Sequence, residues 1–121
     1  SLASRRFDEI FEGVAPFLCG TSVEADEYPD GPRAAEIAEA IRVLGNLVGN
    51  TISHEVGHSL GLSLPHGPPD EFHNLFDTPN AMMDNGGARS FEERAEIDGQ
   101  GPAVFVPENR AYLQEILPVA P

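Results

Sequence analysis

The sequence predicts a small, mainly helical domain with minor β-structure, that is, a reduced α+β fold. Its 121 residues can form one domain with a modest core but are too few for two. Apolar residues make up 40% of the chain, which suits a globular domain better than a disordered one. Beyond residue 33 they recur at every third or fourth position, which is the period of a helix. We therefore expect a long central helix, an irregular loop after it and a helix near the C-terminus.

The first thirty residues give weaker signals. Apolar residues between positions 7 and 18 are spaced as in one or two helical turns, but Gly13 and Pro16 interrupt the pattern. Residues 17–23 are the only candidate for a short strand. Residues 24–32 combine acidic residues with proline and glycine, and this composition predicts a loop.

The clearest element begins at Arg33 and runs into the histidines at 54 and 58. Asp30 to Pro32 supplies a plausible helix start. Steps of 4, 3, 4 and 4 residues separate the apolar positions and predict a stripe that faces a core, formed by Ile37, Ile41, Leu44, Val48 and Ile52. Gly45 and Gly49 lie one turn apart, and each costs about 1 kcal/mol relative to alanine inside a helix. They suggest that a neighbouring segment packs close to the backbone, or that the helix kinks.

The second half of the chain holds a loop, a turn and two helices. Residues 63–80 are rich in proline, glycine and polar groups, and predict an irregular loop that carries His66 and His73. Residues 79–87 predict a turn that contains both methionines. Ser90 followed by Glu93 forms a capping box, which predicts a short helix over residues 90–97. Residues 107–117 predict a final helix whose inner side is formed by Tyr112, Leu113, Ile116 and Leu117.

The net charge of −13 argues against two classes of partner. All seven basic residues are arginines, against twenty acidic residues. Such a chain repels nucleic acid and anionic membranes, so we expect the protein to bind neither. No apolar run approaches the roughly eighteen residues of a membrane span. Cys19, the single cysteine, has apolar neighbours and is interpreted as a buried small hydrophobic residue; it permits no internal disulfide and leaves the compartment open.

The segment that starts at His54 reads HEVGHSLGL and carries the chemistry. Residues four apart on a helix share a face, so His54 and His58 can point imidazole nitrogens at one ion, usually zinc. Glu55 lies beside that face, where it can reach a water on the metal without being a ligand. Gly61 allows the chain to leave the helix through a left-handed turn. Two unrelated histidines on an exposed helix would give the same spacing, but all four histidines fall within one stretch of twenty residues.

This motif, followed by a loop histidine and then by PNAMMD, resembles the metzincin zinc endopeptidases. Their pattern is HExxHxxGxxH with a later methionine-containing turn beneath the metal. The resemblance covers residues 50–86 and implies a zincin-like fold, with a single catalytic domain over residues 1–121. It implies that Zn2+ is the cofactor, that His54 and His58 are ligands and that Glu55 is the general base. Met83 would be the methionine of the supporting turn.

The chain departs from the family pattern in two places. Leu64 stands where the third histidine is usual. The run from His73 to Met83 is similar to the stretch that joins the third histidine to the turn in compact metzincins, which implies His73 as the third ligand and residues 63–72 as an insertion. His66 and one of the glutamates at 92, 93 and 96 are the alternatives. Only 53 residues precede the motif, so the fold is either reduced or a fragment that lacks an N-terminal sheet.

These observations lead us to expect a zinc-dependent endopeptidase that acts on peptide or protein substrates. The metal would polarise the scissile carbonyl and activate water, and Glu55 would carry the proton to the leaving amine. The alternative is a non-catalytic zinc-binding or protein-interaction module derived from a protease. Glu55 favours the enzyme, because a structural zinc site needs four protein ligands and no base beside the metal.

Overall fold

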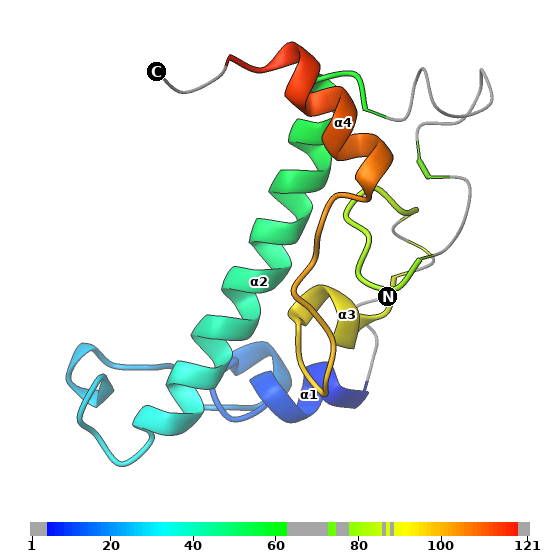
Figure 1. Cartoon of the computed structure of the whole chain (residues 1–121). Coiled ribbons are helices and arrows are strands. Elements are labelled where there is room, and N and C mark those ends of the chain that lie inside the picture. Colours follow the sequence, from blue (N-terminus) through cyan, green and yellow to red (C-terminus); the bar gives the residue numbers. More distant parts are fainter. Residues whose placement is uncertain (1–4, 63–72, 75–77, 86, 88, 119–121) are drawn as a thin grey trace.

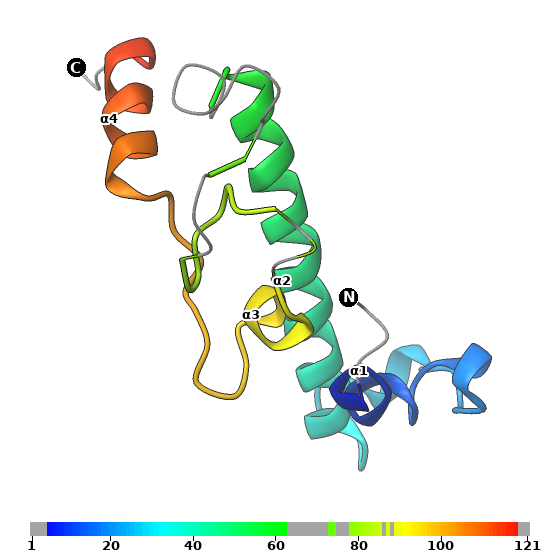
Figure 2. The same cartoon turned by 90° about the vertical axis from the view of Figure 1, so that its right-hand side faces the viewer.

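The computed structural model describes residues 5–62, 73–74, 78–85, 87 and 89–118. Its elements are α1 (Arg5–Phe11), the 3-10 helices η1 (Pro16–Leu18) and η2 (Ala25–Glu27), α2 (Ala34–Ser59), α3 (Phe91–Ala95) and α4 (Pro107–Ile116). The described part is mainly helical, as predicted. The helix α2 forms the long axis, with α1 beside its first half, α3 beside its middle and α4 near its C-terminal end (Figures 1 and 2).

The helix α2 is one continuous element of 26 residues, as the spacing of its apolar positions predicts. Its C-terminal end is closed by two backbone hydrogen bonds, Leu62 N to Gly57 O at 3.0 Å and Gly61 N to His58 O at 2.9 Å. This is the Schellman arrangement, which requires a left-handed residue after the helix. Gly61 supplies it with φ of +90°, so the predicted left-handed exit is confirmed. The chain thereby turns back beneath the last turn of α2.

The main core lies where α1 and α3 pack on the first half of α2. It is formed by Ile10, Phe11, Ala15, Ala40, Val43, Leu47, Phe91, Ala95 and Ile97. Phe7 adds ring contacts with Phe11 and Phe91, whose centroids lie 4.9 and 5.7 Å away. The helix α1 therefore packs against both α2 and α3.

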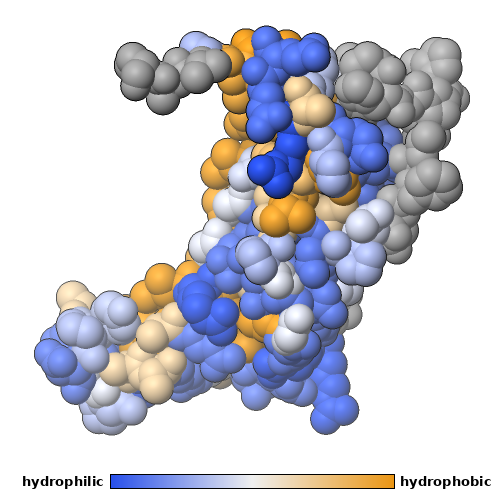
Figure 3. Space-filling view, in the orientation of Figure 1, coloured by the Kyte–Doolittle hydropathy of each residue, from blue (hydrophilic) through white to orange (hydrophobic). Residues whose placement is uncertain are grey.

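The predicted direction of the apolar stripe on α2 is wrong. Of its five residues only Ile37 is buried; Ile41, Leu44, Val48 and Ile52, together with Val56, are between 48% and 57% exposed. The helix instead buries Ala40, Val43 and Leu47, whose steps of 3 and 4 fit the same period. The spacing of apolar residues identifies the apolar faces of a helix, but it does not show which of two such faces other helices cover. Figure 3 shows hydrophobic residues along the left-hand edge of the molecule, where α2 runs.

Gly45 and Gly49 of α2 do not mark a close neighbour. A Cβ placed on Gly45 or Gly49 would meet nothing within 4 Å among the described atoms. Both face the same side of the helix as the exposed apolar residues. The suggestion that a segment packs against their backbone is therefore wrong for the described part of the chain.

The predicted strand at 17–23 is also wrong. Pro16 begins η1 and Cys19 ends it in the left-handed conformation with φ of 66°, so the chain turns where a strand was expected. Cys19 is exposed, so its interpretation as a buried hydrophobic residue is wrong, and Phe17 is also exposed, at 76%. Within the described ranges the β-structure is one parallel bridge between Ala81 and Val104, and no sheet is formed.

The two C-terminal helices begin where the sequence indicates. Ser90 caps α3 by accepting the backbone N–H of Glu93 at 3.1 Å, although the Glu93 carboxylate turns to other partners. The last helix α4 starts at Pro107, but Ile116 and Leu117 are each 45% exposed, so its predicted inner side is only partly covered. The Tyr112 hydroxyl donates to Leu60 O at 2.8 Å and links α4 to the end of α2. No described helix combines the length and the apolar character needed to cross a membrane.

Candidate metal centre

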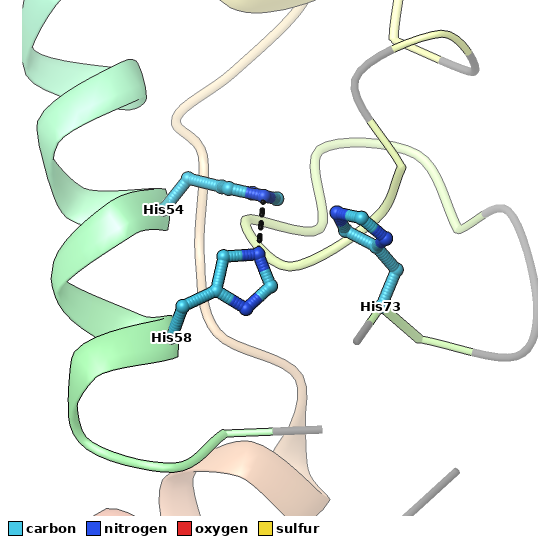
Figure 4. A group of neighbouring side chains, drawn as sticks. All are labelled: His54, His58 and His73. Carbon is cyan, nitrogen blue, oxygen red and sulfur yellow. Dashed lines mark hydrogen bonds between the residues drawn. The ribbon is translucent and has the colours of Figure 1, made fainter. Parts of the chain in front are cut away.

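Three of the four histidines converge at the C-terminal end of α2. His54 and His58 come from its last two turns, and His73 approaches from the segment that follows the helix (Figure 4). One ring nitrogen from each residue can be chosen so that all three lie within 4.8 Å of one another. The three rings are half-buried, so they combine partial shielding from water with access from outside.

The spacing of these nitrogens fits a zinc ion. Tetrahedral zinc with Zn–N bonds of about 2.0–2.1 Å separates two ligand nitrogens by about 3.3 Å. The Nε2 atoms of His54 and His58 lie 3.0 Å apart, and the set including His73 spans at most 4.8 Å. The largest separation exceeds the tetrahedral value by up to about 1.5 Å, so the side chains would have to move closer to bring all three nitrogens to bonding distance. The donor set, three imidazoles, also matches the preference of zinc for nitrogen ligands.

A backbone carbonyl fixes the tautomer of His54. Its Nδ1 lies 2.7 Å from Met82 O, and because a carbonyl can only accept, Nδ1 is the protonated nitrogen. The Nε2 atom of the neutral ring therefore carries the lone pair, which accepts a hydrogen bond from His58 Nε2 at 3.0 Å (Figure 4). Met82 is itself held by the bridge to the C-terminal segment, where Met82 N donates to Val104 O at 2.7 Å. Such outer partners orient metal-binding histidines and raise their affinity.

His73 is positioned through the residue that follows it and through a buried carboxylate. Asn74 N donates to Met83 O at 3.0 Å, and the Asn74 side chain donates to Asp84 Oδ1 at 2.9 Å. The other oxygen of Asp84 accepts Thr78 N at 2.7 Å, and Asp84 is only 1% exposed. Sequence reasoning missed Asp84 and Asn74. Nothing in their local sequence indicates that two short loop segments share one carboxylate.

Met83 lies directly under the last turns of α2. It is fully buried, and its Sδ would come within 2.5 Å of a Cβ added to Gly57. Gly57, between the two helical histidines, thus allows the methionine to approach the helix backbone. The turn at 79–85 supports the histidines in two ways: Met82 through its carbonyl and Met83 through packing.

Glu55 is exposed beside the histidines and shares a cavity with His54 and His73. The cavity has a volume of about 240 Å³ and is partly open to solvent. It is lined by Asn50, Thr51, His54, Glu55, His73, Asn85, Gly87, Arg89 and Arg94. A carboxylate, two of the candidate ligands and two guanidinium groups therefore border one space.

The surroundings of His58 favour its neutral form. Burial lowers the pKa of His58 below its ordinary 6.5, and the neighbouring His54 and His73 lower it further, whereas Glu55 acts in the opposite direction. Only a neutral imidazole can bind a metal. The lowered pKa extends the pH range in which His58 is ready to bind.

The alternative third ligands are placed elsewhere or not described. His66 lies outside the described residues. Glu93 accepts from Arg89 Nε at 3.2 Å and from Asn80 N at 2.9 Å, and Glu96 accepts Ala103 N at 2.6 Å. In the part of the chain that the structure describes, the group of possible ligands around His54 contains no glutamate of the segment 92–96.

Comparisons of the chain with protein-family models, with curated protein sequences and with solved structures found no match. The functional argument therefore depends on the residues and the geometry of this site.

Proposed function

We propose that this chain is a zinc-dependent endopeptidase of reduced, zincin-like fold, with His54, His58 and His73 as the metal ligands and Glu55 as the general base. One observation carries the proposal: three imidazoles converge around one point, and a carboxylate next to the first ligand borders the same cavity. Three protein ligands leave a fourth position for water or substrate, as in catalytic zinc sites.

The chemistry follows from this arrangement. Zinc in such a site polarises a substrate carbonyl and lowers the pKa of water to about 7. Glu55 takes a proton from the attacking water while the oxygen of that water bonds to the carbonyl carbon. When the carbon–nitrogen bond breaks, Glu55 passes the same proton to the leaving amine. Met82 O keeps the His54 lone pair directed at the metal position throughout.

The exposed position of Glu55 suits this role. A base must meet substrate and water, and Glu55 borders the open cavity although its helix neighbour Gly57 is buried. A purely structural zinc site would need a fourth protein ligand. Among the described residues, the group that could hold a metal consists of the three histidines.

The test is Glu55→Gln, which removes the base and preserves size. Native mass spectrometry should find one zinc ion in both proteins, whereas peptide cleavage should fall by at least about a hundredfold in the variant. Glu39→Gln, at an exposed position in the first half of the same helix, is the matched control and should cleave normally. Cleavage should stop with a chelator and return with zinc. Wild-type turnover by Glu55→Gln would show that the assigned mechanism is wrong, and a zinc-loaded wild type without turnover would favour the non-catalytic module.

A further inference from the structure

The cavity beside the histidines is lined by more basic than acidic described residues, although the protein as a whole is acidic. The chain carries twenty acidic residues and seven arginines. Among the described residues that line the cavity, two are arginines, Arg89 and Arg94, and one is a carboxylate, Glu55. Charges farther away than about 8–10 Å are largely screened at physiological ionic strength. A group inside the cavity is therefore affected more by nearby charges, such as those of these lining residues, than by distant charges that contribute to the net charge of −13.

The two arginines have different roles. Arg89 is almost fully buried, and its guanidinium is held by Glu93 Oε1 at 3.2 Å and by Asn50 Oδ1 at 2.7 Å. Its charge is thus balanced within the fold. Arg94 is partly exposed, and its Nη2 donates to Thr51 Oγ1 at 2.8 Å. In the described part of the chain, ion pairs join four of the seven arginines to carboxylates, and Arg94 is not one of the four.

The hydrogen bond to Thr51 places Arg94 relative to the metal ligands. Thr51 precedes His54 by three residues, so the two side chains are neighbours on α2, about one turn or 5 Å apart along the axis. A guanidinium has five N–H donors in a planar fork, and the bond to Thr51 occupies one of them. The remaining donors can bind a carboxylate through two parallel hydrogen bonds.

We propose that Arg94 binds a carboxylate of the substrate peptide, one or two residues from the bond that is cleaved. The distance follows from the extended chain, which advances about 3.3–3.6 Å per residue and so covers the separation between Thr51 and His54 in one or two residues. The inference rests on the proposed function, since it names the substrate class of the same site. An acidic side chain and the terminal carboxylate of a short peptide offer the same chemistry.

The experiment compares peptides first, on the unaltered protein. A library of N-acetylated, C-amidated peptides is digested and the cleavage sites are read by mass spectrometry. Glu or Asp should be enriched one or two residues from the cut bond, and replacing that Glu by Gln should lower kcat/KM by about ten- to a hundredfold, the value of one charge-assisted interaction. A second library with free C-termini tests the other source: cleavage near the free carboxylate would identify the terminal group as the one bound.

Variants then assign the preference to one residue. Arg94→Gln should abolish discrimination between the Glu and Gln peptides, whereas Arg94→Lys should keep part of that discrimination. Arg110→Gln removes one positive charge outside the cavity and should keep all of it. In zinc-loaded Glu55→Gln, which should bind peptides without cleaving them, the same arginine substitutions should change the preference for the Glu peptide in the same way. Cleavage without any preference for either carboxylate, or a preference that survives Arg94→Gln, overturns this inference alone. Absence of cleavage from every peptide overturns the proposed function instead.

Discussion

Replacing glycine by alanine in α2 should stabilise the fold at Gly45 and Gly49 but destabilise it at Gly57. Gly45 and Gly49 have open space where a Cβ would be, with no described atom within 4 Å. Alanine there should stabilise the fold by about 1 kcal/mol each, because it lowers the entropy lost on helix formation. At Gly57 a Cβ would lie 2.5 Å from Met83 Sδ and 3.2 Å from Leu62 Cδ1.

Both neighbours of Gly57 are fully buried, so they cannot move without disturbing others. Overpacking of this kind costs about 1–3 kcal/mol. The gain of about 1 kcal/mol in helix propensity offsets part of that cost. We expect Gly57→Ala to destabilise by up to about 2 kcal/mol, measured by urea unfolding in the presence of a chelator so that bound metal does not contribute.

A double variant identifies the cause. Met83→Val shortens the opposing side chain, and it should lessen the cost of Gly57→Ala, with a coupling energy of about 0.5–3 kcal/mol for residues in contact. Two results would refute the reasoning. Destabilisation by Gly45→Ala or Gly49→Ala would mean that the open face of α2 is covered in solution. Stabilisation by Gly57→Ala equal to that at the other positions would mean that Met83 does not pack against the helix.

The remaining predictions concern the metal. Loss of a residue that only supports a ligand typically weakens metal binding by roughly 10- to 100-fold. His73→Ala should weaken zinc binding by more than this, whereas His66→Ala should leave zinc affinity unchanged. In a competition titration at fixed pH, the reverse result would assign the ligand to His66, and no effect of either would point to a carboxylate. Met83→Leu roughly conserves volume and should cost less than about 1.5 kcal/mol with zinc affinity nearly unchanged; complete loss of zinc would contradict a packing role. Asp84→Asn removes one of the two carboxylate oxygens that accept hydrogen bonds from Asn74 and Thr78, and it should weaken zinc binding by about tenfold. Unchanged affinity would show that the position of His73 does not depend on this carboxylate.

The parts of the fold that local chemistry determines could be predicted from the sequence. The length of α2 follows from its periodicity, its end from Gly61, and the start of α3 from Ser90. Each depends on residues within one or two turns of the position concerned. The helical spacing also brings the nitrogens of His54 and His58 together before any tertiary contact is considered.

The parts that depend on distant residues could not be predicted. Both faces of α2 are apolar, and only the packing of α1 and α3 decides that Val43 is buried and Val48 exposed. Residues 17–23 have strand-like composition, but in the described structure they have no neighbouring strand with which to pair. The support of His73 by Asp84, and the approach of Arg94 to Thr51, join segments between 10 and 43 residues apart in the chain. No local pattern encodes such pairs.

The exposed apolar face of α2 and the acidic composition act against each other when copies of the chain meet. Five side chains from Ile41 to Val56, each about half exposed, extend along about 22 Å of the helix and favour association. The charge of −13 opposes association through mutual repulsion. Near the isoelectric point of about 4.4 that repulsion disappears while the apolar face is unchanged. Concentrated salt shortens the range of the repulsion in the same way. We therefore expect mild acid or high salt to make the chain self-associate through α2.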